Sequence, residues 1–248
     1  LQFNRVVDGE KLPRAGRWFY PEEFRKAFSF NAWISVNSLS QSLIITAPQL
    51  LLHGAVGSRS LSVYGVFLQL HNFSRGFVVS LNASVVTRSS LDYDGDPAAY
   101  HRMLGKSAVG LAAFSVAGFL AFLAVGDRAL HLWLGIDFDE PTLFLLSLLL
   151  MTTLYASLSL VFGNLSVTSK RVRQPALTGL VVALAALATL IVMEHQGVET
   201  LRHYVYAVAV FQVLYVVSKN MVTLYVLGPV LSLAEKGKQL AINLAALA

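Results

Sequence analysis

Two basic residues, Arg75 and Lys219, stand alone inside long apolar segments of the sequence. Arg75 is the only charged residue between Ser60 and Thr87, and Lys219 is the only one between His203 and Ala234. A cation in the hydrocarbon layer of a membrane costs several kcal/mol, so such residues normally face a bundle interior or a water-filled cavity. A cavity with fixed positive charge is suited to holding an anion, and we expect Arg75 and Lys219 to do so.

Polar side chains accompany these cations at helical spacing. At 100° per residue, one set in the first apolar segment falls within roughly an 80° arc: Asn31, Ser35, Ser38, Ser42, Thr46, Gln49 and His53. Such a stripe predicts a wall that faces a hydrated lumen. The alternative is that small polar residues join one helix to the next. Pro48 lies in the same segment and predicts a kink, either a passive bend or a hinge.

The segments that carry the two cations are also polar on defined faces. In the second segment His71, Arg75 and Asn82 share one face, and Gln69, Gly76, Ser80 and Thr87 share another, with Asn72 beside it. In the last segment one face carries Gln212, Tyr215, Lys219 and Thr223. The predicted substrate-binding set is therefore Arg75, Lys219, Gln49, His53, Asn72, Gln212 and Tyr215.

The segments that position these residues have the composition of membrane helices. Mean hydropathy is +0.60, and only 13% of residues are charged. Runs of about 20 apolar residues can cross a bilayer. We predict an all-α integral membrane protein with six spans, good to a few residues: 28–53, 61–87, 107–125, 142–165, 176–193 and 204–227. Residues 1–27 would form a cytoplasmic or interfacial segment, 28–227 the six-helix lobe, and 228–248 a cytoplasmic tail or the start of a further helix.

Most of the 19 Lys and Arg residues fall on one side of this topology, which predicts that both ends of the chain are cytoplasmic. Between Arg14 and Lys26, aromatic residues alternate with charged ones just before the first span. That pattern fits an interfacial amphipathic helix, or an aromatic belt with flanking positive charges. No signal peptide precedes it, and the start at Leu1 favours a piece of a longer protein.

Several classes of chemistry lack the residues that they need. The chain has no cysteine, no phosphate-binding loop, no histidines paired at metal-ligand spacing and no hydrolase set at a shared depth. Asp and Glu are absent from all six predicted spans, although proton- and sodium-coupled pumps commonly use them. We therefore expect no enzymatic activity, no cofactor, no metal and no nucleic-acid partner.

The order and spacing of several short motifs resemble a known family. The start of the first span resembles that of the second half of bacterial polysaccharide transporters, the lipid-linked oligosaccharide flippases of the multidrug/oligosaccharidyl-lipid/polysaccharide exporter superfamily. The matching residues are Phe28-Ser29-Phe30-Asn31-Ala32-Trp33, Ser38-Leu39-Ser40-Gln41, Val63-Tyr64-Gly65, Leu132-Trp133-Leu134-Gly135 with Phe138, and the small and basic stretch Ser166 to Arg173.

This resemblance implies one lobe of a two-lobe transporter in the bacterial inner membrane. The transporter would move undecaprenyl-pyrophosphate-linked oligosaccharide by alternating access, with Arg75 and Lys219 holding the anion. Its expected partners are the lipid-linked glycan, membrane lipids and an N-terminal lobe of the same protein. Two alternatives stay open, a cation-coupled multidrug exporter of the same superfamily and a non-transporting scaffold for a glycan-assembly complex.

Overall fold

The computed structural model of the chain describes residues 21–55, 58–92, 97–135, 137–157, 159–198 and 200–226. Within these ranges the secondary structure is entirely helical, without a strand. The helices are α1 (Pro21–Ile45), α2 (Ala47–Ala55), α3 (Ser58–Asp92), α4 (Pro97–Leu134), α5 (Glu140–Ser157), α6 (Ser159–Thr168), α7 (Arg173–His195) and α8 (Leu201–Val226). The predicted interfacial residues before Pro21, the predicted tail and the loop 93–96 lie outside the described residues.

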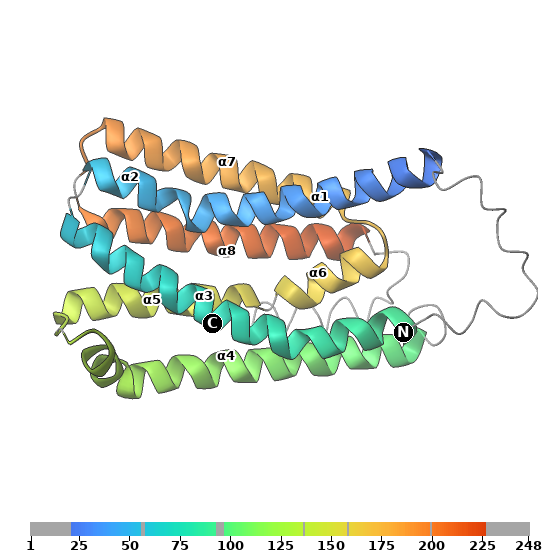
Figure 1. Cartoon of the computed structure of the whole chain (residues 1–248), viewed down its shortest axis with the longest axis horizontal. Helices are drawn as coiled ribbons and strands as arrows, with labels where there is room; N and C mark the ends of the chain where they lie inside the picture. Colours follow the sequence, from blue (N-terminus) through green and yellow to red (C-terminus); the bar gives the residue numbers. More distant parts are fainter. Residues whose placement is uncertain are drawn as a thin grey trace, which may run out of the picture.

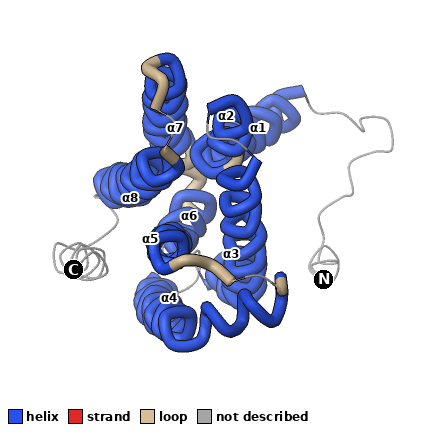
Figure 2. The backbone as a smooth tube through the Cα atoms, turned by 90° about the vertical axis from the view of Figure 1, so that its left-hand side faces the viewer, coloured by secondary structure: helices blue, strands red, loops and turns tan. Residues whose placement is uncertain are grey.

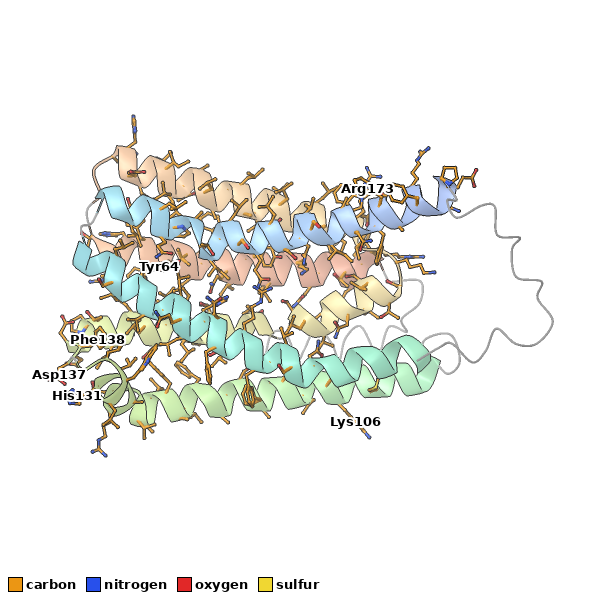
Figure 3. All side chains as sticks on the ribbon, in the orientation of Figure 1. Tyr64, Lys106, His131, Asp137, Phe138 and Arg173 are labelled. Carbon is orange, nitrogen blue, oxygen red and sulfur yellow. The ribbon has the colours of Figure 1, made fainter. Side chains whose placement is uncertain are left out.

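The helices form a bundle in which successive long segments run in opposite directions (Figure 1). The start of α1, the turn between α6 and α7 and the end of α8 meet at one end of the bundle, near Arg173 (Figure 3). The opposite end carries an ion pair between His131 Nδ1 and Asp137 Oδ1, 2.7 Å apart. The first helix therefore begins, and the last helix ends, at the same end of the bundle. This alternation agrees with the predicted order of segments.

Helix α5 lies in the middle of the bundle, against α3, α4 and α8 (Figure 2). Its residues Leu146 and Leu149 are fully buried, as are Phe67 and Val78 of α3. Helices α4 and α7 lie outside and expose many large apolar side chains, among them Leu120, Leu123, Val181, Leu184 and Ile191. Helices α4 and α7 thus have the exposed apolar surface that lipid would cover, and α5 packs in the centre.

Among the described residues, four helical segments are long and apolar enough to cross a membrane: 105–134, 140–168, 173–195 and 201–226. The segments that carry the predicted first and second spans are α1 with α2, and α3. They hold Asn, Gln, Ser and Arg side chains, which lower their hydropathy. The described part of the chain is thus all-helical with four candidate membrane spans, and the six-span, two-lobe arrangement stays a prediction.

The first predicted span is broken into two helices. Helix α1 ends at Ile45 and α2 begins at Ala47, just before Pro48, which has no amide hydrogen to donate. At this break the Gln49 amide donates to the Thr46 carbonyl at 3.1 Å rather than to Ile45, its acceptor in a continuous helix. The carbonyl oxygen of Ile45 accepts a 2.7 Å hydrogen bond from the buried hydroxyl of Tyr64 in α3. The irregularity predicted from Pro48 is seen as a break between α1 and α2, and Tyr64 supplies the donor for a buried carbonyl at this break.

Helix α4 is much longer than the span predicted for it. It begins at Pro97, which suits the first turn of a helix because its nitrogen needs no partner there. It ends at Leu134, and the next residue, Gly135, has a φ of +67° that glycine adopts readily and an amide that donates to the His131 carbonyl. Hydropathy detects the part of a helix that hydrocarbon can cover, whereas polar residues such as His101 and Lys106 continue the same helix beyond it.

Candidate functional site

The two isolated cations lie on different helices, and the charge of one acts on the other. Arg75, near the middle of α3, lies within electrostatic range of Lys219 in α8. Lys219 is only 6% exposed, and Arg75 is half-buried. The charge of Arg75 also acts on His71, one turn earlier, and on Tyr215. Two like charges repel strongly where water is scarce, so an anion that contacts both would be stabilised.

The aromatic ring of Tyr215 packs near the ammonium group of Lys219 and is itself held by α1 and α7. The ammonium nitrogen of Lys219 lies 5.4 Å from the centroid of the Tyr215 ring, at cation–π distance. The Tyr215 hydroxyl donates to the side-chain oxygen of Asn37 in α1, at 3.2 Å. The ring also fills the space above Gly179 in α7, where an added Cβ would lie 2.8 Å from the ring. Tyr215 therefore sits where α1, α7 and α8 converge.

A set of buried polar contacts joins the central helices around this site. His71 Nδ1 lies 3.0 Å from the hydroxyl of Thr153 in α5. Thr152 donates a short hydrogen bond to the side-chain oxygen of Gln212, whose amide nitrogen is buried without a partner in the described part of the chain. The amide of Asn164 in α6 donates to Asn82 in α3 at 3.1 Å. Polar contacts of this kind hold membrane helices together, so Gln212 and His71 have a packing role as well.

The predicted polar faces of α3 and α8 differ in how far the structure buries them. On α3, His71 and Asn82 are buried and Arg75 is half-buried, whereas Gln69, Asn72, Gly76 and Ser80 are exposed. On α8, the predicted face of Gln212, Tyr215, Lys219 and Thr223 is buried throughout.

The seam of the first predicted span is uncovered in this chain. Asn31, Ser35, Ser38, Ser42 and Thr46 are exposed, and Gln49 of α2 is half-buried. The side chains of His53 and Thr87 lie outside the described residues. Of the predicted substrate-binding set, the structure thus gathers Arg75, Lys219, Tyr215 and, one turn away, Gln212. It places Asn72 on the exposed face of α3 and Gln49 in α2.

Two cavities adjoin the Lys219 end of the site. A small one, of about 70 Å³, is lined by Lys219 together with Trp33, Asn37 and Ser166, and it has room for a few water molecules. A much larger one opens beyond Trp33 at the end of the bundle. Among the described residues, no three His, Asp or Glu side chains gather closely enough to hold a metal ion.

Sequence reasoning missed Asn37, Thr152, Thr153 and Gly179. Asn37 lies off the polar seam, and the threonines look like ordinary packing residues in an apolar run. A glycine in a membrane helix predicts a close approach, but only coordinates show which side chain approaches it.

Comparison of the chain with protein-family models, curated proteins and solved structures finds no significant match.

Proposed function

We propose that this chain is one lobe of a bacterial inner-membrane transporter that moves an undecaprenyl-pyrophosphate-linked oligosaccharide across the membrane by alternating access. The observation that carries the proposal is that the charge of Arg75 acts on the buried Lys219, while the predicted spans contain no acidic residue. Retaining two neighbouring cations inside apolar helices requires a compensating anion. The anionic head of a transported lipid would be that partner.

The chemistry of the site suits a diphosphate. Such a head cannot cross hydrocarbon unaided, because its charges would lose their hydration. An arginine can donate two parallel hydrogen bonds to phosphate oxygens, and a lysine adds a compact charge. The amides and hydroxyls of the exposed seam offer donors and acceptors to sugar hydroxyls.

The exposed seam also supports a two-lobe arrangement. A polar stripe on the outside of α1 is costly against lipid tails but favourable against a hydrated space shared with a second lobe. In the proposed transporter the seam lines that space, and the two lobes rock against each other around the anion. The lack of a carboxylate in the predicted spans disfavours a site for cationic drugs in this lobe.

The proposal is tested in cells that depend on the full-length protein for surface polysaccharide. Arg75→Ala should abolish export of the lipid-linked glycan and Lys219→Ala should reduce it, with both variants present in the membrane at parental levels. Arg75→Lys should keep partial export if the role is electrostatic. Arg128→Ala removes an exposed charge from the opposite end of the bundle and serves as the control. Normal surface polysaccharide in Arg75→Ala cells would rule out the anion site.

A further inference from the structure

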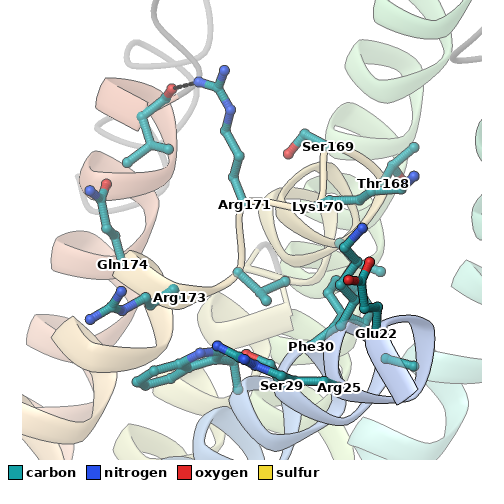
Figure 4. Close-up of a pocket in the computed structure, with 16 residues that line it drawn as sticks. Glu22, Arg25, Ser29, Phe30, Thr168, Ser169, Lys170, Arg171, Arg173 and Gln174 are labelled. Atoms are coloured by element: carbon teal, nitrogen blue, oxygen red, sulfur yellow. Dashed lines mark hydrogen bonds between the residues drawn. The ribbon is translucent and has the colours of Figure 1, made fainter. Parts of the chain in front are cut away.

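A large cavity opens where α1 begins, α6 turns into α7 and α8 ends (Figure 4). It measures about 1540 Å³, larger than the ~300–1000 Å³ of common ligand pockets. Among the described residues, its charged lining consists of Arg25, Lys26, Lys170, Arg171 and Arg173, with one carboxylate, Glu22. A concave surface of one charge sign focuses the potential and attracts ions of the opposite sign.

The basic turn at this cavity is held in a defined position. Arg171 Nη1 donates a 2.5 Å hydrogen bond to the carbonyl of Val226, and the guanidinium of Arg173 lies 5.5 Å from the ring centroid of Trp33. Lys170 has a φ of +58°, a left-handed conformation that glycine adopts far more readily at the end of a helix. A lysine here places a cation at the cavity despite this conformational cost.

The inner wall of the cavity is apolar and leads toward Lys219. Phe30, Trp33, Val167 and Val172 line it, and the last three also line the small cavity that contains Lys219. The lining cations are exposed and form the mouth of the cavity, whereas Phe30, Trp33 and Val172 are half-buried or buried. The buried Lys219 lies in the adjoining small cavity. This order matches an amphiphile with a charged head and an apolar chain.

We propose that this cavity binds the diphosphate head of a polyprenyl lipid, on the side that the charge pattern predicts to be cytoplasmic, before the head reaches Lys219 and Arg75. The inference rests on the proposed function for the identity of the lipid. The cations at the mouth would then load the substrate, and the inner pair would hold it during transport.

Trp33 allows the proposal to be tested locally, because it lines both cavities. The full-length protein, with Trp18→Phe and Trp133→Phe and any tryptophan outside this sequence replaced likewise, is placed in phosphatidylcholine nanodiscs and titrated with farnesyl diphosphate. We expect a saturable change in Trp33 fluorescence. Farnesol should produce no such change, and inorganic pyrophosphate should bind at least about tenfold more weakly, since it lacks the apolar chain.

Three variants locate the binding. Lys170→Gly removes a charge while relaxing the backbone, so it should weaken farnesyl diphosphate binding ~tenfold without unfolding the protein. Lys106→Gln removes an exposed charge of α4 that does not line the cavity and should leave the affinity unchanged. Arg128→Ala, at the opposite end of the bundle, should also leave the Trp33 signal unchanged. Because this assay measures binding and not export, a failed Trp33 response is distinguishable from a failed export assay.

Four results would overturn the proposal. One is the absence of a saturable Trp33 response, and another is an equal loss of affinity in Lys106→Gln and Lys170→Gly, which would indicate general attraction. Equal affinity for inorganic pyrophosphate would assign the cavity to a free phosphate. Full displacement of farnesyl diphosphate by phosphatidylglycerol in the nanodisc would assign it to bulk membrane lipid.

Discussion

Arg75 and Lys219 are separated by most of the chain, yet the fold places them in one electrostatic environment. Lys219 gains some compensation from the Tyr215 ring, since cation–π contacts contribute about 0.5–2 kcal/mol. That contribution offsets only part of the cost of a buried lysine beside an arginine. The remaining cost is the reason to expect an anionic ligand at this position.

Tyr64 carries a separate, structural role at the residue scale. Tyr64→Phe removes the hydroxyl that donates to the Ile45 carbonyl and leaves that buried oxygen without its donor. An unsatisfied buried polar group costs about 1–3 kcal/mol, so the variant should unfold at lower temperature than the parent. Thermal unfolding of the full-length protein in detergent measures this. Tyr225→Phe, at a side chain that is 85% exposed, is the control. Equal midpoints for the two variants would contradict the assigned role.

At the scale of helices, sequence periodicity predicted which faces are polar but not which residues of other helices those faces contact. The faces of α3 and α8 emerge as predicted because residues at helical spacing share a side of the helix whatever its neighbours. Periodicity carries no information on what lies opposite, so the contacts of Tyr215 with Asn37 and Gly179 could not be predicted. The basic residues of the α6–α7 turn entered the sequence reasoning only as markers of orientation. Their gathering around a cavity depends on the meeting of three distant segments.

The close approach of α7 and α8 gives a prediction at this scale. Gly179→Ala would place a Cβ 2.8 Å from the Tyr215 ring, a distance that real Cβ atoms do not tolerate. We expect lower thermal stability and weaker transport, because the ring must move and Lys219 and Asn37 move with it. Gly110→Ala in α4 meets no atom within 4 Å and should stabilise the helix by about 0.5–1 kcal/mol. A Gly179→Ala protein as stable and active as the Gly110→Ala protein would contradict the packing described for Tyr215.

At the scale of the whole molecule, the helices enclose a mostly apolar core that contains a central set of buried polar side chains, and basic side chains gather at one end. Four segments satisfy the length and hydropathy of a membrane span, whereas the more polar α1 and α2 carry the seam and α3 carries Arg75. Hydropathy alone therefore identifies membrane spans least clearly in the segments whose polar residues carry the proposed function. A helix that lines a hydrated space must contain the polar residues that make it a poor candidate span.

The most direct test of the central claim is a double-mutant cycle on transport. The full-length protein and its Arg75→Ala, Lys219→Ala and doubly substituted variants are reconstituted in liposomes, and the initial rate of movement of a fluorescent lipid-diphosphate oligosaccharide is measured for each. If both cations act on one anion, each single change should slow transport about tenfold or more, and the double change should add little to the slower single variant, since residues that act as a unit are strongly non-additive. Parental rates in both single variants would contradict the claim that Arg75 and Lys219 hold the transported anion.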